Sequence, residues 1–261
     1  MSAGPSHAVY YGLGTPEAVR VLSGFGTVVV QSGLYRPGDL RALRVGGTRV
    51  LGYLSVGEDH PLGDRACVPG SEPFHRAVNA DWGSVVVDAG HPGWRDLLLA
   101  RAGDALAHTD GLLLDTLGSA AAGATLARVR DVRETWPGAW LLANRGFTLW
   151  PDLAPLVDGV LIEAFATTHT PGYAVHDEDG LAYTAHWLAA CRERGREVLA
   201  LDYADTPALA QRAHAHAAAA GVPTFVTNRA LSLPGGLPDV PSRPRPPARP
   251  PAHPPARRVG G

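Results

Sequence analysis

The chain has 261 residues, of which 45% are hydrophobic and 18% are charged, and its formal net charge is −2. This near-neutral balance gives no electrostatic basis for binding nucleic acid, and the length suits one domain with a sizeable core. Because no apolar run approaches the roughly 20 residues that cross a bilayer, no membrane association is predicted.

Eight short aliphatic or β-branched runs recur along the chain, bounded by Gly, Pro or Asp. Continuous apolar runs of this length are typical of parallel strands that are buried on both faces. Segments of helical period lie between many of them, so the sequence predicts a (β/α)8 TIM barrel. The runs cover residues 8–12, 27–31, 49–57, 111–115, 139–144, 159–163, 197–203 and 223–228.

Two further segments depart from this alternation. The run SVVVDAG at 84–90 lies between the third and fourth barrel strands, where it predicts an extra inserted strand. Beyond residue 232 the sequence becomes rich in Pro and Arg, which neither form ladders nor pack into a core. We therefore predict a barrel domain over residues 1–232 and a disordered tail over residues 233–261.

One motif occurs twice in the sequence, beginning at Asp110 and at Asp158: Asp, Gly, three aliphatic residues and a carboxylate. Active sites of TIM barrels lie at the C-terminal ends of the strands, where this template places Asp115 and Glu163. The two acids stand on the fourth and sixth strands, and alternate strands contribute to the same inward layer. We expect carboxyl groups about 5 to 8 Å apart, which spans both retaining and inverting glycosidase arrangements. The alternative that each acid only caps a following helix stays open.

Other strand ends are also polar, as in a sugar-binding mouth, although a polar rim is general to barrels. They include Gln31, Ser55, Glu58, Asn144, Arg145, Asp202, Tyr203 and Asn228.

Together with these strand ends, five motifs in order make the chain resemble glycoside hydrolase family 114, the endo-α-1,4-polygalactosaminidase-like proteins. They are YLSVGE at 53–58, GLLLDT at 111–116, ANRG at 143–146, DGVLIEAF at 158–165 and LALDYAD at 199–205. The resemblance covers most of residues 8–228. It implies a TIM barrel that hydrolyses galactosamine-containing polysaccharide with two carboxylates and no cofactor.

On the matching positions, the resemblance makes Asp115 and Glu163 the catalytic pair. Asp115 is assigned as nucleophile or electrostatic stabiliser and Glu163 as general acid/base with a raised pKa, and the swapped roles stay open. The expected sugar-binding residues are Tyr11, Glu58, Asn144, Arg145, Asp202 and Tyr203. Tyr11 could instead be a packing residue, and Glu58 could instead cap a helix that follows it.

Two competing interpretations remain at this point: a carbohydrate-binding barrel with little or no turnover, and a metal-dependent hydrolase. His169 and His176 lie in a polar loop whose spacing fits no familiar metal site. Cys67 and Cys191 have no CxxC partner and no histidine at ligand spacing, so neither a zinc site nor a disulfide is predicted. We expect a monomer with a carbohydrate partner.

The printed N-terminus MSAGPSHAVYYG shows neither a basic segment nor an apolar segment of a secretory signal. The compartment is therefore left open: cytoplasmic as written, secreted if the true start lies upstream.

Overall fold

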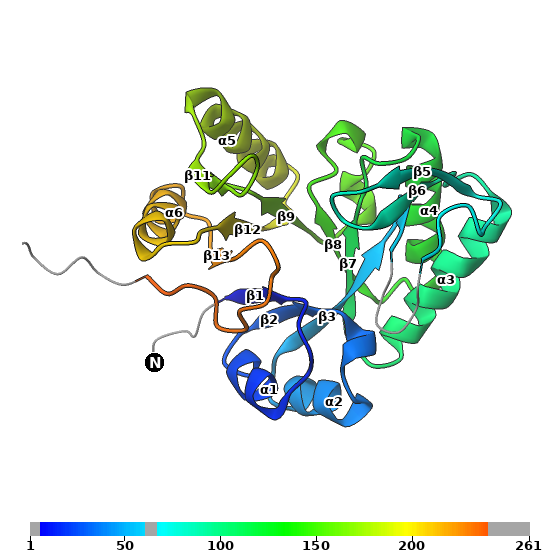
Figure 1. Ribbon diagram of the computed structural model, residues 1–261, viewed down its shortest axis with the longest axis horizontal. Helices are drawn as coiled ribbons and strands as arrows, with labels where there is room; N and C mark the ends of the chain where they lie inside the picture. The colour runs from blue at the N-terminus through cyan, green and yellow to red at the C-terminus, as the bar shows by residue number, and fades with distance from the viewer. Residues whose placement is uncertain (1–5, 61–66, 240–261) are drawn as a thin grey trace, which may run out of the picture.

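The computed structural model describes residues 6–60 and 67–239. Eight strands form one parallel sheet that curls into a barrel (Figure 1), with the order β1-β2-β3-β7-β8-β9-β12-β13. This architecture confirms the predicted TIM barrel. The strands are β1 (His7–Tyr10), β2 (Thr27–Val30), β3 (Arg49–Ser55), β7 (Gly111–Asp115), β8 (Trp140–Asn144), β9 (Gly159–Glu163), β12 (Glu197–Tyr203) and β13 (Thr224–Thr227).

The first and last barrel strands, β1 and β13, stand at the two ends of the hydrogen-bonded order. Two contacts join the chain near this seam. The backbone N–H of Tyr11 donates to the carbonyl of Leu231 at 2.8 Å, and the His7 ring donates through Nε2 to the carbonyl of Ala200 at 2.9 Å. Burial lowers the pKa of His7 to about 4, so this ring is neutral near pH 7.

Helices cover the outside of the sheet, and they begin where the sequence supplies capping side chains. Thr15, Asp177 and Thr206 each accept a hydrogen bond from a backbone N–H of the first turn that follows. The helices are α1 (Pro16–Leu22), α2 (Pro37–Val45), α3 (Pro92–Leu106), α4 (Ala122–Thr135), α5 (Glu178–Glu193) and α6 (Pro207–Ala219).

The strict strand–helix alternation of the prediction fails after β8. The connection there holds two short 3-10 turns, η2 (Phe147–Leu149) and η3 (Ala154–Leu156), in place of an α-helix. Pro151 and Pro155 explain the difference, because proline supplies no N–H for a helical hydrogen bond and clashes with the preceding turn.

The long connection between β3 and β7 contains a small antiparallel sheet with the order β4-β6-β5. Its strands are β4 (Glu58–Asp59), β5 (His75–Asn79) and β6 (Ser84–Val87). The run that predicts an extra strand corresponds to β6, which ends at Val87 and has two partner strands. Residues 61–66 of this connection lie outside the described part of the chain.

The repeated Asp-Gly pairs stand at the N-terminal ends of β7 and β9, opposite the acids. Asp110 accepts a hydrogen bond from the N–H of Val50 in β3 at 2.9 Å, and Asp158 accepts one from Leu141 in β8 at 2.8 Å. A Cβ atom at Gly111 would lie 1.9 Å from a carbonyl oxygen of β8, so only glycine fits. These pairs tie each strand to the preceding strand of the barrel.

The chain stays in contact with the barrel after β13. The N–H of Leu237 donates to the carbonyl of Val226 at 2.7 Å, and the His214 ring donates to the carbonyl of Leu237 at 2.8 Å. Residues 240–261 of the predicted tail lie outside the described residues, so the domain boundary and the disorder stay predictions. None of the helices described is both long and apolar enough to cross a membrane.

Candidate active site

A cavity of about 540 Å³ lies at the C-terminal ends of the barrel strands. Asp115 ends β7, Asn144 ends β8 and Glu163 ends β9, and all three side chains line this cavity. The structure therefore brings the two predicted catalytic acids together with one of the predicted sugar-binding residues. Three neighbouring strands supply them, as expected for a TIM barrel.

Asn144 connects the two carboxylates. Its Nδ2 atom donates to Oδ1 of Asp115 at 2.9 Å and to Oε2 of Glu163 at 2.7 Å. The two accepting oxygens can be no farther apart than these two distances laid end to end. The Oδ1 atom of Asn144 is buried and has no hydrogen-bond partner among the described residues. An unpaired buried acceptor is costly, and the two hydrogen bonds that Nδ2 donates to the acids hold the amide in this orientation despite that cost.

A tyrosine also lies beside each carboxylate. The hydroxyl of Tyr203, at the end of β12, lies 2.5 Å from Oε1 of Glu163. Tyr53, on β3, faces Asp115 and lowers the pKa of that carboxyl. These neighbours of the two acids are thus an amide and two phenols, which carry no charge. Burial and the nearby carboxylates raise the pKa of both tyrosines well above the usual value, so both phenols stay protonated.

The surroundings of the two acids shift the pKa of Asp115. Burial raises the pKa of Asp115, and the negative charge of Glu163 raises it further. Hydrogen bonds from Asn144, Thr116 and Tyr53 act in the opposite direction, but the net direction is upward. The Asp115 carboxyl therefore holds its proton to a higher pH than an exposed aspartate does, because its pKa is raised.

The chain turns sharply after each of the three strand-end residues. Asp115, Asn144 and Glu163 are followed by Thr116, Arg145 and Ala164, with φ of 59°, 54° and 53°. Non-glycine residues seldom adopt positive φ, and a β-branched residue such as Thr116 is strained there. Such backbone strain clusters at functional sites. Positive φ at three consecutive strand ends therefore marks this rim independently of the acids.

Two other predicted sugar-binding residues line the same cavity. Tyr11 follows β1, and its ring packs edge-on against Tyr53 with the ring centroids 5.0 Å apart. Glu58 is only 4% exposed and accepts hydrogen bonds from Ser84 and Ser119, both at 2.5 Å. Glu58 itself lies in β4, which pairs with β6, and no helix begins there, so its alternative role as a helix cap is wrong.

Arg145 and Asp202 do not reach the cavity, although both were expected to bind sugar. The Arg145 guanidinium lies over the rings of Phe147 and Tyr183, at 5.7 and 5.9 Å from their centroids. Asp202 is fully buried and accepts hydrogen bonds from the N–H groups of Ala166 and Thr167 at 2.6 and 2.8 Å. Asp202 thus holds the loop that follows β9.

Asp202→Ala is expected to lower the free energy of unfolding by about 2–5 kcal/mol, because it leaves two buried N–H groups without acceptors. Denaturant unfolding measures this loss, and Asp202→Asn, which keeps one acceptor oxygen, should lose less. A stable Asp202→Ala protein with a raised KM would instead support the sugar-binding role expected from the sequence.

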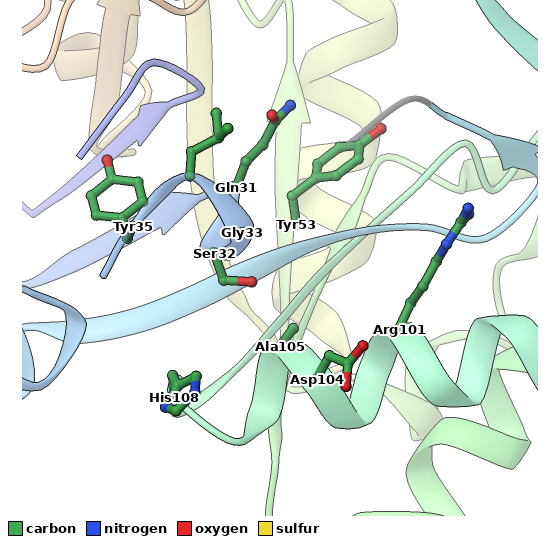
Figure 2. A pocket seen from close by; sticks show the side chains of 10 residues that line it. Gln31, Ser32, Gly33, Tyr35, Tyr53, Arg101, Asp104, Ala105 and His108 are labelled. Atoms are coloured by element: carbon green, nitrogen blue, oxygen red, sulfur yellow. The ribbon is translucent and has the colours of Figure 1, made fainter. Parts of the chain in front are cut away.

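Some residues at the cavity are absent from the expected set, among them Tyr53, His60 and Trp82. A second cavity of about 290 Å³ shares Gln31 and Tyr53 with the first and lies between α3 and the segment after β2. Figure 2 shows this second cavity, into which α3 presents polar side chains. The two acids line only the first cavity.

One cluster outside the cavity has the residue types of a metal site. Ligand atoms of Asp59, Cys67 and His75 lie within 4.8 Å of one another, although Cys67 has no histidine at ligand spacing in the sequence. Arg101 already pairs with Asp59 at 2.7 Å, and the His75 ring lies 3.0 Å from the other oxygen of Asp59. Gly70 donates its N–H to the second nitrogen of that ring. These contacts satisfy the carboxylate and the ring as a hydrogen-bonded ion-pair cluster.

Known proteins similar to this chain are found among the solved structures. No protein-family model matches the chain, and none of the curated proteins matches it. Among solved structures, the chain is similar to the glycoside hydrolase domain of PelA from Pseudomonas aeruginosa, with 30% identity and a TM-score of 0.77. That similarity covers 88% of this chain and 97% of the domain.

Two more distant likenesses concern the fold alone. Ega3 from Aspergillus fumigatus, solved in complex with galactosamine, has 14% identity and a TM-score of 0.67, over 89% of this chain and 94% of Ega3. The α-galactosidase TtGalA from Thermus thermophilus has 16% identity and a TM-score of 0.54, over 90% of this chain and 63% of that one. Identity and coverage against the PelA domain show the family. The chain therefore belongs to the family of the PelA glycoside hydrolase domain and is a glycoside hydrolase family 114-like protein.

Proposed function

We propose that this glycosidase hydrolyses α-1,4-linked galactosamine-containing polysaccharide or oligosaccharide with Asp115 and Glu163. The observation that carries the proposal is the hydrogen-bonded unit in which one amide, that of Asn144, contacts both carboxylates. An amino sugar carries a positive charge when it is not acetylated. In the cavity its ammonium group meets two carboxylates whose hydrogen-bond donors among the described residues are neutral, so no cationic side chain among them competes with it. The galactosamine found in the Ega3 complex agrees with this choice of substrate.

The short distance between the two carboxyls, which Asn144 bridges, supports hydrolysis with retention of the anomeric configuration. Retaining enzymes hold their carboxyls about 5–5.5 Å apart, whereas inverting enzymes hold them about 6.5–9.5 Å apart to admit a water. Nδ2 of Asn144 lies 2.9 and 2.7 Å from one oxygen of each acid, which limits these two oxygens to the shorter range. In the retaining reaction one carboxylate attacks the anomeric carbon, and the other acid protonates the leaving oxygen and then activates water.

The roles within the pair stay as the sequence suggests. Asp115 acts as the nucleophile or electrostatic stabiliser and Glu163 as the general acid/base. The pKa of Asp115 is raised in the protein without sugar, and a bound sugar changes the surroundings of this carboxyl. Tyr203 and Tyr53 orient the two carboxyls, and Tyr11 and Glu58 line the sugar position.

The test is release of new reducing ends from partially deacetylated α-1,4-galactosaminogalactan. We expect release by the wild-type protein and none by the double variant Asp115→Asn/Glu163→Gln, with α-1,4-linked neutral glucan as the control polymer. Binding of the galactosamine polymer without release by the wild type would favour the alternative, a carbohydrate-binding barrel with little or no turnover. Activity that a chelator abolishes would point to a metal-dependent hydrolase.

A further inference from the structure

An exposed tryptophan stands beside the cavity without a packing role in the core. Trp82 lies in the turn between β5 and β6, its side chain is 46% exposed, and it lines the cavity that holds the two acids. Large exposed aromatic side chains at a concave site commonly provide a binding surface. An indole offers a flat apolar face that suits the C–H face of a sugar ring.

A cation lies against this tryptophan. The guanidinium carbon of Arg229 is 5.0 Å from the centroid of the Trp82 ring, and Nη2 of Arg229 donates to the carbonyl of Asp81 at 3.3 Å. The backbone N–H of Arg229 donates to the hydroxyl of Tyr173 at 2.9 Å. These partners are an indole, a carbonyl and a phenol, and none of them carries a negative charge.

Aromatic contacts connect Trp82 to the catalytic pair. The His169 ring lies 6.0 Å from the ring of Trp82 and 4.5 Å from the ring of Tyr203, and both contacts are edge-on. Tyr203 in turn donates to Glu163. Burial lowers the pKa of His169, and the charge of Arg229 lowers it further against the opposing effect of Glu163, so this ring is neutral near pH 7. One wall of the cavity therefore runs from the carboxylates to the exposed indole.

The cavity is thus electrostatically uneven along this wall. Asp115 and Glu163 favour a positive charge at one end, whereas Arg229 disfavours one beside Trp82. A polymer that carries both amino and N-acetylamino sugars presents both charge states in turn. The sugar beside the carboxylates can carry an ammonium group, whereas a sugar stacked on Trp82 would lie near the Arg229 guanidinium that packs on the same ring.

We propose that Trp82 is the stacking surface for the sugar that neighbours the one at the carboxylates, and that Arg229 makes this position selective for an uncharged sugar, such as an N-acetylated one. This inference rests on the proposed function, since it takes the substrate to be a galactosamine-containing chain. Trp82 and Arg229 are specificity-determining residues in this account, and neither takes part in bond cleavage.

The test measures the Kd of defined α-1,4-linked galactosamine oligomers by calorimetry in an Asp115→Asn background, where turnover is blocked. Oligomers of one length are compared in fully deacetylated and partially N-acetylated form. We expect about tenfold tighter binding of the partially N-acetylated form, and Arg229→Gln should bring the two forms to within about twofold. The preference should also shrink when salt rises from about 0.05 to about 0.5 M, because salt screens exposed charges.

Trp82→Ala is expected to weaken binding of both oligomers by about tenfold, whereas Trp82→Phe keeps most of the affinity. Two matched controls are Tyr183→Ala, which removes an exposed aromatic ring away from the cavity, and Arg20→Gln, which neutralises an exposed arginine on α1. Neither control should change the Kd or the preference. In the wild-type background, Trp82→Ala should raise KM about tenfold and leave kcat unchanged within about twofold.

Unchanged binding in Trp82→Ala overturns the stacking role, and a preference that survives in Arg229→Gln overturns the charge selectivity. Absence of binding to every oligomer overturns both. Because the Kd values are measured without turnover, a wild-type protein that binds with this pattern but releases no reducing ends would contradict the proposed hydrolysis and leave the sugar positions intact.

Discussion

Asp115→Asn and Glu163→Gln are each expected to lower kcat by about 10³-fold or more. An amide cannot attack the anomeric carbon as a carboxylate does, nor protonate the leaving oxygen as a carboxylic acid does. Because the two acids act as one unit, the double variant should lose scarcely more activity than either single variant. The measurement is the initial rate of reducing-end release, with Glu17→Gln on the exposed side of α1 as the matched control.

Asp115→Asn should also make the protein more stable while it makes it inactive. The pKa of Asp115 is raised in the folded protein, so its ionisation destabilises the fold as pH rises through the unfolded and then the folded pKa. Asparagine carries no such charge, and we expect a Tm about 2–4 °C higher at pH 7. The gain should vanish at a pH below the unfolded pKa of the carboxyl. A lower Tm at pH 7 would contradict the raised pKa.

The same two variants separate the roles of the acids. A sugar oligomer with a dinitrophenyl leaving group needs no proton to depart, so a variant that lacks only the general acid should still form the glycosyl intermediate from it. We expect Glu163→Gln to cleave this substrate with a burst of dinitrophenol and Asp115→Asn to remain inactive. The reverse pattern would assign the nucleophile to Glu163.

Asn144→Leu is expected to lower kcat by about 10²-fold and to move the pH profile upward. The amide donates to both acids, and this hydrogen bond lowers the pKa of Asp115. Its loss removes a donor from the ionised Asp115 carboxylate, so the pKa of Asp115 moves to a higher value. Because the nucleophile Asp115 must be ionised to act, the acidic limb of the profile should move to higher pH.

The measurement is kcat/KM from pH 3 to 9 for wild type, Asn144→Leu and Asn228→Leu, with the fold checked by thermal unfolding. Asn228 follows β13 and bonds to Ser232 rather than to a carboxylate, so it serves as the matched amide control. A profile that only loses height, with both limbs in place, would show that Asn144 positions the acids without affecting their ionisation.

The barrel could be predicted from the sequence because eight continuous apolar runs that alternate with helical segments are typical of a (β/α)8 barrel. The acids could be placed because a carboxylate at the end of such a run must lie at a strand end. The connection after β8 could not be inferred from periodicity alone, because two prolines replace its helix by short turns. Pro151 and Pro155 were nevertheless visible in the sequence as a signal against a helix.

Arg145 and Asp202 were expected at the cavity because they stand at strand ends within the motifs of the family resemblance, next to Asn144 and Tyr203. Adjacent residues of a strand point to opposite sides, so one member of each pair faces away when the other faces the cavity. This signal was present in the sequence. Trp82 was different, since its place beside the cavity depends on how the β4-β6-β5 sheet packs against the barrel, which no local pattern encodes.

The two Asp-Gly pairs set the same length for the two strands that end in the acids. Each pair fixes the start of its strand against the neighbouring strand, and each acid follows its glycine by the same number of residues, in Gly111–Asp115 and in Gly159–Glu163. Loss or gain of one residue within either strand would turn its acid toward the outer helices, because side chains alternate between faces. The number of residues between each glycine and its acid thus decides whether the two carboxyls face each other. Substitutions that keep this number can change the lining of the barrel without moving the two carboxyls apart.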